Sequence, residues 1–221
     1  MTPPDNATVP TFCHLDDDES ANLQWETMAE TLQAAGVSWR VLQENDNFDD
    51  NAFEWFQSFV DAKPGSVLFD QGVRPVADIV ETFRGMVAND TLPHVTWIIA
   101  PTALSEHANN HPADGEDLTA RLLRALGSNP AVYSKTVFIL NYDEGGQFYD
   151  HHWVPLPPSS AGDGKSSVTT MGELLPAAQL GVPAGSPVGL GFRVPLIIVS
   201  PWTRGHLVYS RAFFTSQIMF L

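Results

Sequence analysis

The chain has 221 residues, 43% of them hydrophobic and 17% charged, which is enough to bury a core as one domain or slightly more. Its formal net charge is −15 with no Lys/Arg cluster, which argues against nucleic acid as a partner. The single cysteine, Cys13, excludes an internal disulfide, and no apolar run is long enough to span a bilayer. The first residues do not resemble a signal peptide, so the sequence leaves the cellular location unknown.

The first half of the chain predicts an exposed lead-in followed by alternating helices and strands. Residues 1–22 are rich in Pro, Thr and Asp and form the lead-in, whereas 23–221 carry the fold. Apolar residues at helical spacing predict a helix over 23–35, closed by Gly36. The elements expected next are a strand over 37–42, a helix carrying Phe53, Trp55, Phe56 and Phe59 in the core, and a helix over 76–88.

The second half continues the alternation and contains one long loop. Strands are predicted over 95–100, 136–142 and 194–202, with a helix over 118–126 between the first two. Residues 155–191 hold many Pro, Gly and Ser residues and predict a loop of a length that usually serves a site. Alternating helices and strands predict an α/β protein with a mainly parallel sheet.

The most informative segment runs from Thr136 to His152. An apolar strand, expected to be buried on both faces, leads into Asp143 and Glu144, two glycines, and then Asp150 and His151. Neighbouring carboxylates at the carboxyl end of such a strand repel each other unless a cation compensates them. The residues therefore favour a divalent metal site over the alternative, a polar surface turn.

Several motifs together resemble one known family, the bacterial and fungal phosphoesterases that include non-haemolytic phospholipases C and related acid phosphatases. The similarity runs in order from about residue 25 to 210. The motifs are Ala35–Val41, Asn45–Asn51, Ile99–Pro101 with Leu104–His107, Asn129–Thr136, Asn141–Gly146, Gly189–Pro195 and Val199–Gly205.

The resemblance implies an alkaline-phosphatase-like three-layer α/β/α sandwich and metal-dependent hydrolysis of phosphate esters through a hydroxyl nucleophile. It makes Asp143 and Glu144 the metal ligands, with the identity of the divalent ion left open. It makes His107 and His151 the residues that hold phosphoryl oxygens or protonate the leaving group, roles that suit imidazole near neutral pH. Arg193 has two readings, a phosphate clamp or the partner of an acidic residue.

The sequence also departs from the family pattern. The Glu-Asn metal motif and the Ser or Thr nucleophile expected near the N-terminus are not found before residue 25, and Phe213-Phe214 occupy the place of an Asp-His pair. The chain is therefore predicted to be the C-terminal part of a phosphoesterase catalytic domain. Two alternatives are a catalytically inactive fragment or interaction protein, and an unrelated metal-dependent hydrolase that uses Asp143, Glu144 and His151.

The expected partners follow from these predictions. The substrate would be a phosphate ester or a phospholipid, and a sheet that lacks N-terminal strands would expose edges that favour self-association. Relatives in the family are often secreted or periplasmic.

Overall fold

The computed structural model describes residues 23–48, 50–146, 150–160, 162–167, 169–178, 181–205 and 208–209. The predicted lead-in and the Phe213-Phe214 pair lie outside these residues. The chain divides into two compact units, Met1–Thr136 and Val137–Leu221.

The first helix of the first unit, α1 (Met28–Ala34), begins later than the predicted residue 23 because Thr27 caps it. The Thr27 hydroxyl accepts a hydrogen bond from the Glu30 backbone N–H at 3.2 Å, and the Glu30 carboxylate accepts one from the Thr27 N–H at 2.8 Å. At the other end Gly36 has a φ of +70°, and Val37 N–H bonds to the carbonyl of Leu32. The predicted glycine stop is confirmed as a Schellman motif.

The predicted aromatic helix is instead two short turns, η1 (Ala52–Trp55) and α2 (Gln57–Val60), because Phe56 between them is extended. The expected core is largely confirmed. Phe59 is buried and Phe53 stacks on it at a ring distance of 5.1 Å, although Trp55 is 40% exposed. These rings, with Trp39 and the helical turn η2 (Phe69–Val73), form one apolar cluster.

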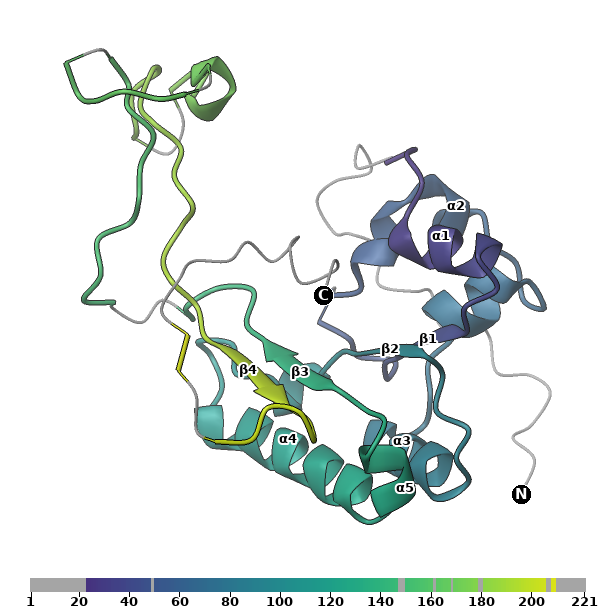
Figure 1. Ribbon diagram of the computed structural model, residues 1–221. Coiled ribbons are helices and arrows are strands. Elements are labelled where there is room, and N and C mark those ends of the chain that lie inside the picture. The colour runs from purple at the N-terminus through teal and green to yellow at the C-terminus, as the bar shows by residue number, and fades with distance from the viewer. Residues whose placement is uncertain are drawn as a thin grey trace. The chain divides into compact units, whose positions relative to one another are not determined.

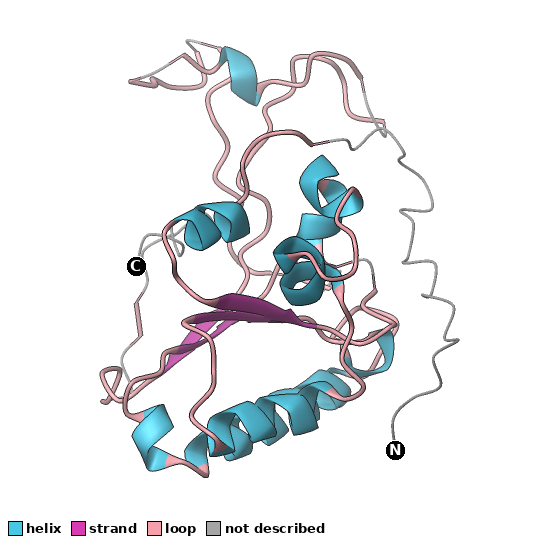
Figure 2. Cartoon of the chain, turned by 90° about the vertical axis from the view of Figure 1, so that its right-hand side faces the viewer, coloured by secondary structure: helices cyan, strands magenta, loops and turns pink. Residues whose placement is uncertain are grey.

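The sheet of the first unit contains two parallel strands, β1 (Trp39–Leu42) and β2 (Val95–Ile98), with Trp39 opposite Val95. Figure 1 and Figure 2 show α1 and α2 on one side of this pair and the longer helices on the other. The parallel pairing and the alternation of elements confirm the prediction of an α/β unit here. The helices on the second side are α3 (Ile79–Ala88), α4 (Pro112–Gly127) and α5 (Pro130–Tyr133).

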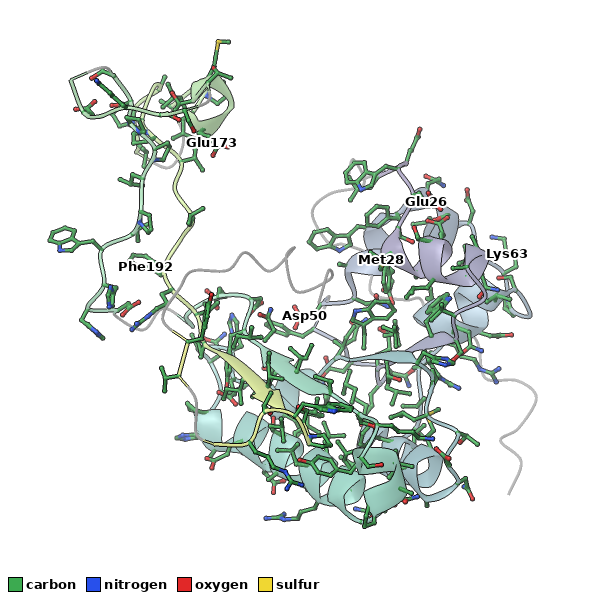
Figure 3. The ribbon with its side chains drawn as sticks, in the orientation of Figure 1. Glu26, Met28, Asp50, Lys63, Glu173 and Phe192 are labelled. Atoms are coloured by element: carbon green, nitrogen blue, oxygen red, sulfur yellow. The ribbon has the colours of Figure 1, made fainter. Side chains whose placement is uncertain are left out.

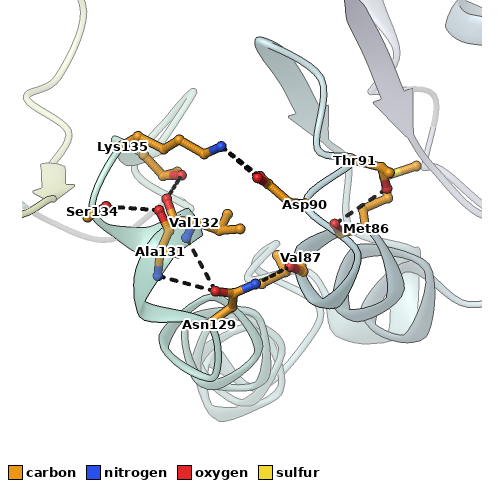
Figure 4. Close-up of polar contacts among 10 residues, drawn as sticks. Met86, Val87, Asp90, Thr91, Asn129, Ala131, Val132, Ser134 and Lys135 are labelled. Atoms are coloured by element: carbon orange, nitrogen blue, oxygen red, sulfur yellow. Dashed lines mark hydrogen bonds and ion pairs between the residues drawn. The ribbon is translucent and has the colours of Figure 1, made fainter.

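Asn129 joins three of these helices (Figure 4). Its carbonyl oxygen accepts hydrogen bonds from the first turn of α5, and its amide donates to the Val87 carbonyl in α3 at 2.9 Å. Lys135 donates to Asp90 at 2.9 Å just beyond the same helices. Asn129 follows the C-cap of α4, Ser128, so its side chain links the start of α5 to α3 close to the end of α4.

The second unit contains β3 (Phe138–Asn141) and β4 (Leu196–Val199), which pair antiparallel with Phe138 opposite Val199. The expectations of parallel pairing and of burial on both faces are wrong for this pair. Burial alternates along β3, and Val137 and Ile139 are 49% and 40% exposed. Antiparallel strands tolerate water on one face, which accounts for the alternation.

The predicted long loop is confirmed and lies between β3 and β4. We call residues 151–192 the arm, which Figure 1 shows extending away from β3 and β4. The described residues of the arm contain one short helical turn, η4 (Met171–Glu173). Hydrogen bonds between the outgoing and returning segments hold the arm together, such as Val188 N–H to the Glu173 carbonyl at 2.7 Å.

Candidate functional site

Two loops meet at the carboxyl ends of β1 and β2 in the first unit. The Thr102 hydroxyl of the loop after β2 donates to Asp46 Oδ1 of the loop after β1 at 2.6 Å. The Phe48 ring packs against the His107 imidazole, with 4.8 Å between ring centroids. His107 therefore lies at the edge of a parallel sheet where ligands usually bind.

The surroundings of His107 define its tautomer. The Asn109 backbone N–H donates to His107 Nδ1 at 3.4 Å, so in the neutral ring Nε2 carries the proton and can donate it to a ligand oxygen. The His107 N–H in turn donates to the hydroxyl of the buried Ser105 at 3.4 Å. The backbone and a buried hydroxyl thus hold this half-buried histidine in place.

Phe48 adopts a left-handed backbone conformation with a φ of +55°, which is unfavourable for a residue with a large side chain. The Phe48 N–H donates to Asp46 Oδ1 at 3.3 Å, and the same oxygen accepts the Thr102 hydroxyl. Local strain of this kind persists where surrounding contacts impose it, often beside a functional residue. No sequence signal marked Phe48, because a positive φ at phenylalanine has no composition signature.

A buried amide network supports the loop that carries Phe48. The Gln43, Asn47 and Asn51 side chains are at most 3% exposed. Asn51 Nδ2 donates to Gln43 Oε1 and to the Gly72 carbonyl, both at 2.8 Å, and Gln43 Nε2 donates to the Val73 carbonyl at 2.7 Å. Sequence reading placed Asn51 in a family motif but did not find this network, which depends on the fold of residues 72 and 73.

Asp143 and Glu144 directly follow β3 in the second unit, as predicted, and both are exposed. The Glu144 N–H donates to Asp143 Oδ1 at 2.8 Å. Neither carboxylate forms an ion pair with a Lys, Arg or His among the described residues. The described part of the chain contains no group of three His, Cys, Asp or Glu residues that could hold a metal.

Asp150 is the centre of a second polar cluster in this unit. Its side chain is 12% exposed and accepts two hydrogen bonds from the Arg193 guanidinium, at 3.1 and 3.0 Å. The His152 N–H donates at 3.2 Å, and His151 Nδ1 lies 3.5 Å from Asp150 Oδ1. The acidic-partner reading of Arg193 is confirmed.

These contacts set the ionisation of Asp150. Loss of water around the carboxylate raises its pKa, but the hydrogen bonds from His152 and Arg193 and the nearby positive charge outweigh this effect and hold the pKa below its ordinary value. The carboxylate is therefore ionised at neutral pH and faces the exposed His151 ring.

The predicted site residues are divided between the two units. His107 belongs to the first unit, whereas Asp143, Glu144 and His151 belong to the second. Their roles as ligands and proton donors stay predictions.

Comparison with known proteins decides the family. A model of the phosphoesterase family matches residues 5–221. The chain belongs to this family.

Three phospholipases illustrate the extent of the similarity. The phosphoesterase chain is 42% identical to the hemolytic phospholipase C of Pseudomonas aeruginosa, over 91% of this chain and 30% of the relative. It is 38% identical to the non-hemolytic phospholipase C of Burkholderia pseudomallei, over 92% and 32%. It is 37% identical to phospholipase C A of Mycobacterium tuberculosis, over 88% and 38%.

The resemblance inferred from the motifs is thereby confirmed. This phosphoesterase chain spans about a third of the length of the curated relatives it matches. In its described residues, the helices are too short or too polar to cross a bilayer.

Proposed function

We propose that this chain serves in the hydrolysis of phosphate ester bonds in phospholipids, in the manner of a phospholipase C. The observation that carries the proposal is the 42% identity to a hemolytic phospholipase C over 91% of the chain, which includes the acidic pair after β3. All three relatives described above are named phospholipases C. The reaction would release a phosphorylated head group or a phosphate.

Asp143 and Glu144 would hold a divalent metal ion. Two adjacent carboxylates without an ion-pair partner among the described residues suit a hard divalent ion, since their mutual repulsion falls when it binds. When bound, such an ion polarises phosphoryl oxygens and neutralises charge that grows in the transition state. Two carboxylates are an incomplete ligand set, so further ligands would come from outside the described residues.

His107 would bind a phosphoryl oxygen. Its Nε2–H is the free donor of the neutral tautomer, because Nδ1 accepts from Asn109. Phe48 and the backbone fix the ring so that this donor keeps one direction.

His151 would protonate the leaving alkoxide. The carboxylate of Asp150 lies 3.5 Å from Nδ1 of His151 and orients the exposed ring, which leaves Nε2 to face the leaving group. Arg193 keeps Asp150 ionised and in place through two hydrogen bonds. Asp150 would therefore position His151 without contacting the substrate.

Within the family, the chain would form the C-terminal part of a catalytic domain with an alkaline-phosphatase-like α/β/α sandwich, residues 23–221. Helices on both sides of β1 and β2 support this arrangement for the first unit. The hydroxyl nucleophile and the remaining ligands would come from residues outside the described ranges.

A second candidate is a catalytically inactive member of the family that retains the scaffold as an interaction protein. The observation that favours it is that Asp143 and Glu144 supply only two potential metal ligands. The described residues contain no group of three potential ligands. The two candidates differ in whether the purified chain turns over a phosphodiester.

The test measures metal binding by calorimetry and hydrolysis of a soluble chromogenic phosphodiester, with Mg²⁺, Ca²⁺, Mn²⁺ and Zn²⁺ in turn. Asp143→Asn is expected to weaken metal binding and hydrolysis at least about 100-fold, because a ligand matters more than the residues that orient it. Asp163→Asn, an exposed acid hydrogen-bonded to two serines, is the matched control and should change neither. Metal binding without turnover favours the inactive member, and no metal binding refutes the proposed site.

We also propose that the chain self-associates through its strand edges. β1 and β2 form one two-stranded sheet and β3 and β4 another, so every described strand has one edge that no described strand covers. Such edges pair readily with another chain.

A further inference from the structure

The arm, residues 151–192, has an unusual surface. Its sequence contains only three charged residues, Asp163, Lys165 and Glu173, within a chain of net charge −15. Seven of its large apolar side chains are exposed. They are Trp153 (95% exposed), Met171 (80%), Phe192 (66%), Leu156 (58%), Leu190 (51%), Val188 (43%) and Val182 (42%).

The backbone of the arm is organised although its side chains are not buried. Leu174 and Pro187 form a β-bridge, and Leu190 N–H bonds to the Pro155 carbonyl at 3.4 Å. At Gly189 a Cβ atom would lie 2.5 Å from Leu156 Cδ2 and 2.7 Å from the Pro155 carbonyl oxygen, so the two segments approach closely there. Figure 3 shows Glu173 near the far end of the arm and Phe192 closer to β4.

We propose that the arm inserts its apolar side chains into the surface of a zwitterionic phospholipid bilayer. Trp, Phe, Leu and Met gain free energy when they leave water, and Trp is favoured at the boundary of head groups and acyl chains. With few charges to desolvate, the arm enters that boundary at little electrostatic cost. Hydrogen bonds across the arm satisfy part of its backbone, which a bilayer requires.

A lipid surface suits this feature better than a protein partner does. The apolar residues are spread along both segments of a narrow ribbon, whereas a protein interface needs a packed patch of complementary shape. Lipid adapts to any arrangement of side chains. The inference rests on the proposed function, because the phospholipid substrate would be part of the same bilayer.

The net charge of the chain determines which lipid head groups the arm should bind. A net charge of −15 repels an anionic leaflet, and Lys165 is the only Lys or Arg of the arm, too few for a polybasic contact. Binding should therefore be strongest on phosphatidylcholine vesicles and should weaken as phosphatidylserine is added.

Vesicle flotation with the full chain tests the inference. The double variant Trp153→Ser/Phe192→Ser is expected to bind phosphatidylcholine vesicles about 10-fold or more weakly than the wild type, because two large side chains no longer enter the lipid. Trp25→Ser is the matched control. Trp25 is 64% exposed, belongs to the first unit and should leave vesicle binding unchanged.

Met171→Ser, at an 80% exposed position of the arm, serves as an independent variant if the double variant misfolds by circular dichroism. It should reduce vesicle binding by a smaller amount. Wild-type protein that does not bind phosphatidylcholine, or arm variants that bind as well as Trp25→Ser, would overturn the inference. The inference would also be overturned if the wild-type chain were a dimer that does not bind vesicles and the double variant were a monomer. The arm would then be a protein interface.

Hydrolysis of the soluble phosphodiester separates this inference from the proposed function. Arm variants should retain that hydrolysis while losing vesicle binding. Vesicle binding that depends on the arm, in a chain that hydrolyses no phosphodiester, would leave the membrane contact standing and remove the proposed function.

Discussion

Contacts made by single residues orient the two histidines of the candidate site. The family resemblance pointed to His107, and the structure adds the contacts that orient it: Phe48 against its ring, Asn109 on Nδ1 and Ser105 on its backbone. Asp150 does the same for His151. Sequence patterns identify residue types that suit the chemistry, but they do not contain the contacts between distant loops.

Phe48→Gly should separate a positioning effect from a stability effect. Glycine adopts a φ of +55° without strain, so we expect the free energy of unfolding to change by no more than about 1 kcal/mol. Loss of the ring should free His107 and lower kcat/KM for the soluble phosphodiester about 10-fold. Urea unfolding and steady-state kinetics measure the two quantities.

Phe48→Tyr keeps the ring and is the control, with kcat/KM expected near the wild-type value. A Phe48→Gly variant with unchanged kinetics would contradict the positioning role.

Asp150→Asn should alter the dependence of stability on acid pH. The folded-state pKa of Asp150 lies below its value in the unfolded chain, so its contribution is complete above the ordinary pKa of about 3.8 and is lost as pH falls through the folded-state value. In Asp150→Asn this contribution is absent at every pH. The difference in unfolding free energy between wild type and variant should therefore shrink below about pH 4.

Urea unfolding at several pH values measures this difference. A difference that stays constant from neutral pH into the acid range would show that Asp150 is not stabilised as a carboxylate in the folded chain.

At the scale of elements, the predicted types were mostly confirmed and the boundaries were not. The helix α1 starts at Thr27 because the capping box with Glu30 is there, a signal present in the sequence. The aromatic helix breaks at Phe56, whose backbone is extended with a φ of −97° and a ψ of 135°. Helical spacing alone does not reveal such a break.

Asn51→Ala tests the buried amide network. Removing the Asn51 side chain leaves Gln43 Oε1 and the Gly72 carbonyl without this donor in a buried place, and we expect a loss of about 2–4 kcal/mol in the free energy of unfolding. Asn89→Ala removes an exposed amide that bonds to the Gly85 carbonyl and should cost less than about 1 kcal/mol. Equal losses from the two variants in urea unfolding would contradict the importance of the network.

Thr27→Ala tests the cap of α1. Losing the hydroxyl that accepts from Glu30 should lower the free energy of unfolding by about 1 kcal/mol, whereas Thr27→Ser keeps the acceptor and should behave nearly as wild type. Urea unfolding followed by circular dichroism measures both variants, and an unaffected Thr27→Ala chain would argue that the cap contributes little.

At the scale of the whole molecule, net charge and strand edges act against each other. A charge of −15 acts to keep copies of the chain apart, whereas strand edges that no described strand covers would draw them together in the proposed self-association. Salt screens the repulsion and leaves edge pairing intact. Light scattering should therefore show larger particles at high salt than at low salt, and a monomer at every salt concentration would contradict self-association.

The local signals of the chain were sufficient for its family, its alternating elements, the glycine stop after α1, the long loop and the acidic pair after β3, because each of these is written in consecutive residues. Only the folded chain revealed three other features. They are the antiparallel pairing of β3 and β4, the packing of Phe48 against His107, and the hydrogen bonds between Asp150 and Arg193. Those features join residues tens of positions apart, and the free energy that selects among such pairings belongs to packing and hydrogen bonding in three dimensions rather than to any local pattern.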